Sequence, residues 1–241
     1  DLHRRRPGAR PRRRQGRMMA ANLPPWRQLV GIPLNVLLFL TLMVLAWGSW
    51  TGFVAHPARA GVIVLHLAMI PIMTLSTSGR SKGLEHAPDW RPFFPLLVFH
   101  SLFTAVAMPM LDARGLWVLP GGDVLRWTGL ALMAAGVVLR LGPMAALGRR
   151  FASVVALQPD HALATTGWYA RVRHPSYLGI LLMDLGFVGV FRCGPGVLLL
   201  PVVLWMFKRR MDVEEEFMLR RFGDEYRAYV ARTARLVPGV Y

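Results

Sequence analysis

Long apolar runs separated by short polar connections make up most of this chain. Six runs stand out, and we assign spans to residues 29–50, 60–77, 92–111, 124–147, 178–191 and 196–207. The first four approach the roughly 20 residues that a membrane-spanning helix needs, whereas the last two are shorter, so a final hairpin that is tilted or only partly inserted is the alternative. The pattern therefore predicts an all-α fold, namely a polytopic membrane helix bundle. Six spans are predicted, and five spans are the alternative.

Basic residues gather on one side of these spans. Lys and Arg cluster before the first span and after the second, fourth and sixth, while the other connections carry only Arg59, Arg114 and Arg192. Cytoplasmic connections of membrane proteins are enriched in Lys and Arg, so both termini are expected in the cytoplasm. The formal net charge of +16 follows from this bias and from a basic N-terminal arm. We expect membrane lipid as a partner and no nucleic acid.

The composition narrows the class further. Hydrophobic residues make up 54% of the chain, too many for an ordinary soluble domain. The single Cys193 excludes an intrachain disulfide and a cysteine-based metal cage. Leu, Ala, Arg, Gly and Pro are frequent, as in proteins from GC-rich bacterial genomes. We expect an integral membrane protein of the bacterial inner (plasma) membrane, and nothing in the sequence predicts an obligate protein partner.

The chain divides into three parts. Residues 1–28 are rich in Arg, Pro and Gly without apolar periodicity and are expected to form a disordered basic arm. Residues 29–111 hold the first three transmembrane helices. Residues 112–241 hold the other three, a long loop at 148–177 and an amphipathic C-terminal region, in which Gly223 is expected to separate two short helices.

Ionisable residues also lie inside the apolar runs. Arg140 is in the fourth span and Asp184 in the fifth, and a charge at such a depth is costly unless it is paired or hydrated. Arg140 is therefore a functional candidate, with an Arg140–Asp184 ion pair as the structural alternative. His66 and His100 lie alone on apolar faces, where hydrogen bonding between helices is favoured over metal ligation.

The loop at 148–177 is longer than a connection needs, which is typical of a site or a lid. It contains His161 and ends in Arg173-His174-Pro175, where Pro175 suits the first turn of a helix. The exposed amides of that turn, with Arg173 and His174, predict a site for a carboxylate or phosphate; simple anchoring at the membrane surface is the alternative. No carboxylate or thiol stands at ligand spacing from the histidines, so we expect no metal.

Arg210 and Glu214 follow the last span and are four residues apart, which places them on one face of a helix. A pair of this kind is often a surface ion pair. At this membrane depth, beside the loop that ends at Pro175, a site is favoured. Glu214 can accept hydrogen bonds from a ribose or an ammonium group, and Arg210 can neutralise an anion.

Read together, these residues resemble the isoprenylcysteine carboxyl methyltransferase family over roughly residues 137–238. The resemblance rests on the order and spacing of several short motifs rather than on any one of them. The matching residues are Leu139-Arg140, Leu147-Gly148, Phe151 to Val155, His161-Ala162-Leu163, Gly167-Trp168-Tyr169, Arg173 to Gly179, Arg210, Glu214-Glu215, Phe222 to Tyr226 and Tyr229.

The resemblance implies a membrane-embedded methyltransferase whose core is residues 112–241, with a cofactor loop at the cytoplasmic membrane edge. It implies S-adenosylmethionine as the methyl donor, S-adenosylhomocysteine as the product, and a lipophilic small molecule or lipidated substrate as the acceptor. The implied catalytic residues are Arg140, Arg210 and Glu214. The implied cofactor contacts are His161, Leu163, Gly167, Tyr169, Arg173, His174, Pro175, Tyr177, Glu214 and Glu215. Trp168, Ala162 and Ala164 depart from the family's usual residues.

Several readings of the activity stay open. A carboxylate acceptor is already ionised near neutral pH and needs no general base, which favours ester formation. A phospholipid N-methyltransferase would need a base, and Glu214 or Glu215 is the candidate. An NADPH-dependent membrane reductase of the sterol-reductase type is similar at the C-terminus, but Ile180 stands where those enzymes usually carry an acidic residue. A non-enzymatic transporter or assembly factor leaves the long loop unexplained.

Overall fold

The structure is a computed structural model that describes residues 26–76, 85–86, 93–147, 156–157 and 163–241. Most of the predicted arm at 1–28 and the candidate His161 lie outside these residues. The division of the chain at residues 28 and 111 stays a prediction.

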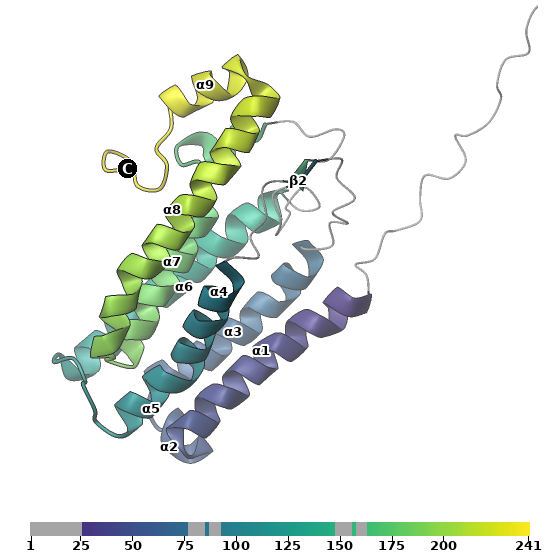
Figure 1. Ribbon diagram of the computed structural model, residues 1–241. Helices are drawn as coiled ribbons and strands as arrows, with labels where there is room; N and C mark the ends of the chain where they lie inside the picture. Colours follow the sequence, from purple (N-terminus) through teal and green to yellow (C-terminus); the bar gives the residue numbers. More distant parts are fainter. Residues whose placement is uncertain (1–25, 77–84, 87–92, 148–155, 158–162) are drawn as a thin grey trace, which may run out of the picture.

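The described part of the chain is a helix bundle (Figure 1). The helices are α1 (Trp26–Trp47), α2 (Trp50–Val54), α3 (Pro57–Ser76), α4 (Phe94–Leu102), α5 (Met108–Ala113), α6 (Gly122–Leu147), α7 (Pro175–Val190), α8 (Gly194–Phe222) and α9 (Asp224–Ala231). A π-helical segment, Phe103–Ala107, joins α4 to α5, and a 3-10 turn, Gly167–Ala170, precedes α7. Two strands of two residues each, β1 (Glu85–His86) and β2 (Ala156–Leu157), pair antiparallel.

Four segments in the described ranges are long and apolar enough to cross a membrane. They are Leu29–Trp47, Pro57–Ser76, Phe94–Ala113 and Gly122–Leu147. The helix α7 is apolar but has only 16 residues, and it packs beside α8, whose first half is apolar. These two helices correspond to the expected fifth and sixth spans. The predicted all-α membrane bundle is confirmed, and the described residues contain four full-length candidate spans where six spans were predicted.

The helices α6 and α7 approach each other closely along a seam of glycines. A Cβ atom on Gly179 of α7 would lie 2.6 Å from the backbone nitrogen of Arg140, and one on Gly136 of α6 would lie 2.6 Å from the carbonyl oxygen of Gly179. A Cβ on Gly129 would lie 2.5 Å from the backbone nitrogen of Val190. Small residues let helix backbones approach in this way. The seam holds Arg140 beside the first turns of α7.

The end of the bundle opposite the C-terminal helices is held by a buried ion pair. Arg126 of α6 donates two hydrogen bonds to Asp112 of α5, at 2.6 and 2.8 Å, and a third to the carbonyl oxygen of Val190, at 2.6 Å. The side chain of Asp112 is fully buried. A bidentate pair of this geometry fixes α5, α6 and the end of α7 relative to one another.

One helix carries the last apolar run into the polar end of the molecule. The helix α8 has 29 residues and is about 43 Å long at the usual rise per residue. Two short amphipathic helices were expected here, and the first of them is instead the second half of α8. Gly223, at a φ of 52°, ends α8 and is followed by α9, as predicted.

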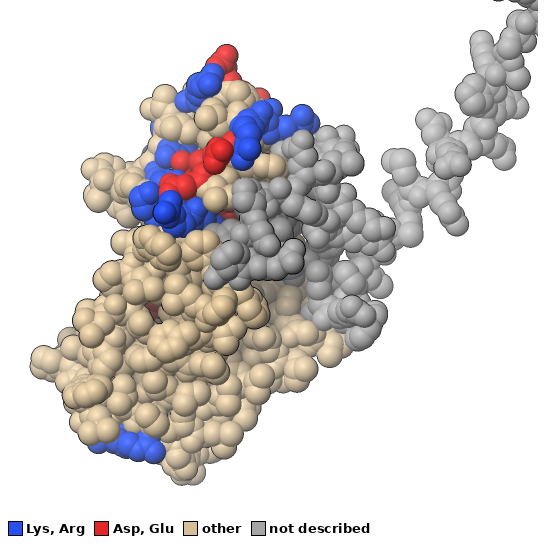
Figure 2. Space-filling view, viewed as in Figure 1, with Lys and Arg blue, Asp and Glu red and all other residues tan. Residues whose placement is uncertain are grey.

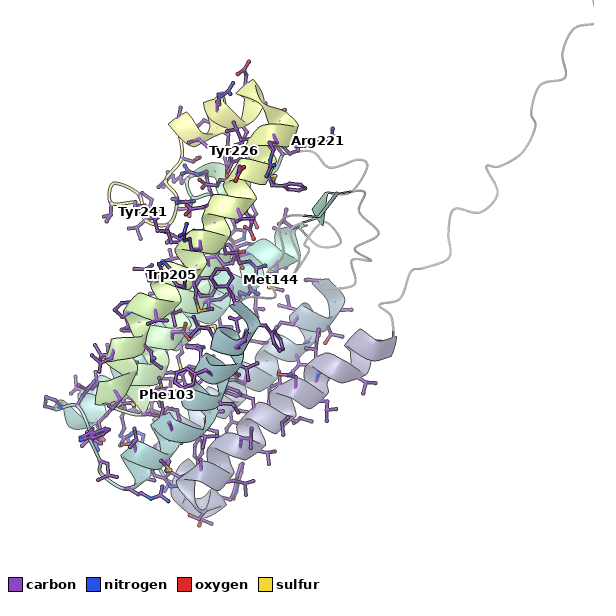
Figure 3. All side chains as sticks on the ribbon, in the orientation of Figure 1. Phe103, Met144, Trp205, Arg221, Tyr226 and Tyr241 are labelled. Carbon is purple, nitrogen blue, oxygen red and sulfur yellow. The ribbon has the colours of Figure 1, made fainter. Side chains whose placement is uncertain are left out.

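Charged side chains concentrate at this end. In the space-filling view, Lys, Arg, Asp and Glu gather over the second half of α8 and over α9, whereas the body below is almost entirely uncharged (Figure 2). Figure 3 shows Arg221 and Tyr226 at the charged end and Trp205 and Phe103 in the body. Large apolar side chains of the body, such as Leu198, are exposed. An exposed apolar surface of this kind is expected to face the hydrocarbon core of a membrane.

Candidate active site

The helix α7 begins at Pro175, as the sequence predicted. Proline lacks an amide proton and has a φ that suits the first helical turn, so it begins a helix without losing a hydrogen bond. His174 is the residue before the helix, and its carbonyl oxygen accepts a hydrogen bond from the amide of Tyr177 at 3.1 Å. This start places the His174 and Tyr177 rings in a stack, with centroids 5.6 Å apart.

The side chains of Tyr177, Glu214 and Arg210 form one group where the apolar bundle meets the charged end. The Tyr177 hydroxyl donates a hydrogen bond to the Glu214 carboxylate. Arg210 Nε lies 3.2 Å from the same oxygen, which confirms the predicted i, i+4 relationship, and its guanidinium lies over the Tyr177 ring. Both ends of the ion pair are about one-fifth exposed. A ligand can therefore reach charges that are only partly screened by water.

Arg140 reaches this group from α6. Its guanidinium donates a hydrogen bond to the hydroxyl of Ser176, in the first turn of α7, at 2.6 Å. The predicted alternative, an ion pair between Arg140 and Asp184, is not formed. Asp184 instead faces His100 of α4, with 3.3 Å between His100 Nε2 and Asp184 Oδ1. Arg140 is thus directed to the site and Asp184 to a separate place in the bundle.

Glu215 has a different environment from its neighbour Glu214. Its Oε1 accepts hydrogen bonds from Arg173 at 2.9 Å and from Arg235 at 3.2 Å, and lies 3.0 Å from His174 Nε2. Burial alone would raise the pKa of Glu215, but the hydrogen bonds from His174 and Arg173 outweigh it and lower that pKa to about 2. Glu215 is therefore an ionised anchor between α8 and the start of α7.

The segment after α9 returns to the start of α7 and covers it. The amide of Arg173 donates to the carbonyl oxygen of Ala234 at 2.9 Å, and the amide of His174 donates to that of Arg235 at 3.1 Å. The C-terminal segment therefore uses the amides of the two residues just before the helical turn at which the sequence predicted exposed amides. Leu236 packs with Tyr177 and completes the cover.

The guanidinium of Arg173 is also bound within the protein. Besides Glu215, it donates to the carbonyl oxygens of Thr233 and Val230. This residue connects the start of α7 to the end of α9 and to the segment that follows it. These contacts give Arg173 a role in positioning the site, and its predicted contact with an anionic ligand stays a prediction.

The 3-10 turn before α7 brings Tyr169 to the same end of the molecule. The Tyr229 hydroxyl on α9 donates to the carbonyl oxygen of Tyr169 at 2.7 Å, and burial raises the pKa of Tyr229 to about 12, so the donor keeps its proton. Gly167 has a φ of 60°, a conformation that favours glycine, and begins this turn. Leu163 is half-buried before it.

Several residues of this arrangement were missed by the sequence analysis. Ser176, Asp212 and Arg235 each make a contact that orders the site, and Arg235 bonds to both Asp212, at 2.6 Å, and Glu215. The sequence offered one signal for them: Asp212 and Glu215 lie close to Arg210 along the same predicted helix, so several charges gather there.

His66 was expected to form a hydrogen bond with another helix. Its Nδ1 instead lies 2.8 Å from the carbonyl oxygen of Val62 in its own helix.

The fold and the site together define an α-helical integral membrane protein with a charged group of residues at one edge of its apolar bundle. Residues 128–220 match the family model of the isoprenylcysteine carboxyl methyltransferase (ICMT) family. The match to that family model is confined to this part of the chain. It contains Arg140, Tyr177, Arg210 and Glu214, the four residues that the structure brings together.

Curated proteins with related sequences carry the corresponding name. The protein-S-isoprenylcysteine O-methyltransferase of Schizosaccharomyces pombe is 35% identical over 119 residues, which are 48% of this chain and 50% of that protein. Enzyme B of that name from Arabidopsis thaliana is 34% identical over 46% of this chain and 58% of its own length. The human enzyme is 36% identical over 46% of this chain and 40% of its own length. The chain spans about half the length of the curated relatives it matches.

A solved structure shows the same fold over most of the chain. It is described as the eukaryotic intramembrane Ras methyltransferase ICMT without a monobody. The TM-score is 0.61 at 22% sequence identity, and the match covers 87% of this chain and 75% of that one. The similarity therefore includes the helices before residue 128, which lie outside the family match.

Proposed function

We propose that this chain is a membrane methyltransferase that transfers a methyl group from S-adenosylmethionine to the carboxylate of a lipophilic acceptor. The observation that carries the proposal is the meeting of Arg140, Tyr177, Arg210 and Glu214 at the edge of the apolar bundle. These residues come from three helices of the region that matches the methyltransferase family. A charged cofactor from water and an acceptor from the bilayer can both reach that edge.

The charges of this group suit S-adenosylmethionine. The amino-acid part of the cofactor carries a carboxylate and an ammonium group, and its ribose carries hydroxyls. Arg210 offers a cation for the carboxylate, and Glu214 offers an acceptor for the ammonium or the hydroxyls. Glu214 Oε2 lies 3.6 Å from His174 Nδ1. Tyr177, with Tyr169 nearby, provides aromatic surface for the adenine.

The chemistry requires alignment more than proton transfer. S-adenosylmethionine supplies a methyl group on a sulfonium: the carbon–sulfur bond breaks as a bond to a carboxylate oxygen forms, leaving a thioether and a methyl ester. The acceptor is ionised at neutral pH, so no residue needs to act as a base. Arg140 would hold the acceptor carboxylate, since a guanidinium pairs well with a carboxylate. Holding both reactants in line and away from water supplies the acceleration.

The acceptor would approach through the membrane. The named relatives act on protein-S-isoprenylcysteine. For this chain the supported class is broader: a lipophilic small molecule or lipidated substrate with a carboxylate. The charged end carries most of the Lys and Arg of the described bundle, so we place it, and both termini, on the cytoplasmic side of a bacterial inner membrane.

Calorimetric titration of the detergent-purified full chain with S-adenosylhomocysteine tests the donor. We expect saturable binding of S-adenosylhomocysteine and none of NADPH. Binding of NADPH alone would assign the chain to the reductases, and binding of neither would end the proposal. The acceptor group is then tested with labelled S-adenosylmethionine, because a methyl ester is released by mild base and a methylated phospholipid amine is not.

A further inference from the structure

A second polar pair lies within the apolar body, away from the site described above. Asp184 of α7 and His100 of α4 face each other at 3.3 Å, in helices that are otherwise apolar at this depth. The Asp184 side chain is only 10% exposed, and its Oδ2 accepts no hydrogen bond from any residue that the structure describes. A buried carboxylate oxygen without a donor is costly, especially in hydrocarbon.

The pair is aligned with the candidate active site. Asp184 is seven residues after Tyr177, so both lie on one face of α7, separated by two turns or about 10 Å along the helix axis. The Tyr177 ring contacts Phe207 of α8, and Asp184 contacts His100 of α4. This face of α7 therefore contacts α8 near the site, through Tyr177, and contacts α4 deeper in the bundle, through Asp184.

The helix α4 covers this face only loosely. All nine of its residues are described, and none is buried. Its nearest ring contact with α8 is made just before the helix begins, by Phe93 and Trp205, whose centroids are 5.7 Å apart. The His100 side chain is 22% exposed. A molecule in the bilayer can thus reach His100, and it reaches the buried Asp184 Oδ2 where the loosely packed α4 gives way.

Comparison with the buried ion pair at the far end argues against a purely structural role. Asp112 is fully buried and receives two hydrogen bonds from Arg126, one on each carboxylate oxygen. That is how this protein satisfies a carboxylate that only holds helices together. Asp184 has one oxygen toward His100 and the other without a donor, beside a helix that is not closely packed.

We infer that Asp184 and His100 form a subsite for the acceptor, which takes a hydrogen-bond donor in the acceptor's tail about 10 Å from the carboxylate that is methylated. The inference rests on the proposed function. It adds that the acceptor carries a second polar group besides its carboxylate. Asp184 Oδ2 would accept a hydrogen bond from a hydroxyl or amide N–H of the acceptor. A purely hydrocarbon tail would leave that oxygen without a donor.

Two matched acceptors test the inference in the purified full chain. Both are long-chain carboxylic acids of equal length, one with a hydroxyl about 10 Å from the carboxylate and one without it. A hydrogen bond to a charged group predicts a KM at least about tenfold lower for the hydroxy acid. Moving the hydroxyl toward either end of the chain should remove the preference, and this series needs no variant.

Variants then assign the preference to the pair. Asp184→Leu should abolish the preference, and Asp184→Asn, which keeps an acceptor oxygen, should keep part of it. Asp123→Leu is the matched control, because it removes the carboxylate of another His–Asp pair, with His56 at 3.1 Å, far from this face. That control should keep the full preference. Affinity for S-adenosylhomocysteine and the unfolding temperature show whether each variant is folded.

The outcomes separate this inference from the proposed function. Equal KM values for the two acids, with S-adenosylhomocysteine bound, would overturn the subsite and leave the methyltransferase intact. Binding of S-adenosylhomocysteine without methylation of either acid would also overturn it, since the hydroxy acid carries both groups that the subsite requires. Failure to bind S-adenosylhomocysteine would remove the proposed function itself.

Discussion

The hydroxyl of Tyr177 donates a hydrogen bond to the carboxylate of Glu214, and this contact joins the first turn of α7 to the polar half of α8. Arg210 binds the same carboxylate from one turn earlier on α8. Glu214 is therefore held in place by two donors before any ligand arrives. A preordered carboxylate costs little to position when a cofactor binds.

Replacing this carboxylate should weaken cofactor binding. Glu214→Gln removes the charge that, in the proposed function, faces the ligand's ammonium or hydroxyl groups, and we expect affinity for S-adenosylhomocysteine to fall by about tenfold to a hundredfold. Glu216→Gln is the control, because Glu216 lies two residues away in an exposed ion pair with Arg220. Calorimetry on both variants makes the comparison, and equal affinities would remove Glu214 from the site.

Arg140 should affect transfer more than cofactor binding. Arg140→Lys keeps a positive charge but cannot pair with a carboxylate through two parallel hydrogen bonds, so kcat/KM for the acceptor should fall about tenfold or more. Affinity for S-adenosylhomocysteine should change little. Arg114→Lys, at an exposed arginine of the opposite end, serves as the control. A loss confined to cofactor affinity would place Arg140 at the donor instead.

The environment of Glu215 predicts a dependence of stability on pH. Its pKa of about 2 in the folded protein lies below its ordinary value of 4.5. Ionised Glu215 therefore contributes its full stabilisation above about pH 4.5 and loses it as the pH falls toward 2. Glu215→Gln should cost about 3 kcal/mol near neutral pH, since it leaves buried arginines with one partner fewer.

Unfolding temperatures of the wild type and of Glu215→Gln, measured in detergent between pH 7 and about 3, check this prediction. The difference between the two proteins should narrow as the pH falls below about 4.5. A difference that stays constant over this range would mean that the ion pairs of Glu215 do not stabilise the fold.

The glycine seam predicts that a single methyl group can disturb the site. In Gly179→Ala the new Cβ would meet the backbone of Arg140 at 2.6 Å, and backbone atoms cannot move aside as a flexible side chain can. We expect a loss of about 1–3 kcal/mol of stability and a fall in transfer rate, because α6 must move and carry Arg140 with it. Gly31→Ala, where nothing lies within 4 Å of the new atom, should be neutral in both assays.

Local patterns in the sequence predicted much of this molecule. The spacing of Arg210 and Glu214 gave their contact, Pro175 gave the start of α7, and Gly223 gave the end of α8. Each of these depends on residues within about one helical turn. The apolar runs likewise gave the membrane spans, because hydrocarbon thickness sets the length of a helix.

Contacts between distant segments could not be predicted in the same way. The partner of Asp184 proved to be His100 rather than Arg140, and nothing near either residue in the sequence decides between them. The amides of Arg173 and His174 are used by a segment about 60 residues away. Such choices depend on how the helices pack, which the glycine seam between α6 and α7 largely determines.

The unbroken course of α8 makes the bilayer itself a part of the geometry of the candidate site. Trp205, near the middle of this helix, lies in the apolar body, and Glu214 lies beyond it in the same rigid rod. A helix that meets a thinner or thicker hydrocarbon layer responds by tilting. Tilting α8 against α7 would change the separation of Glu214 and Tyr177, so lipid chain length becomes a means of adjusting the candidate site without changing its sequence.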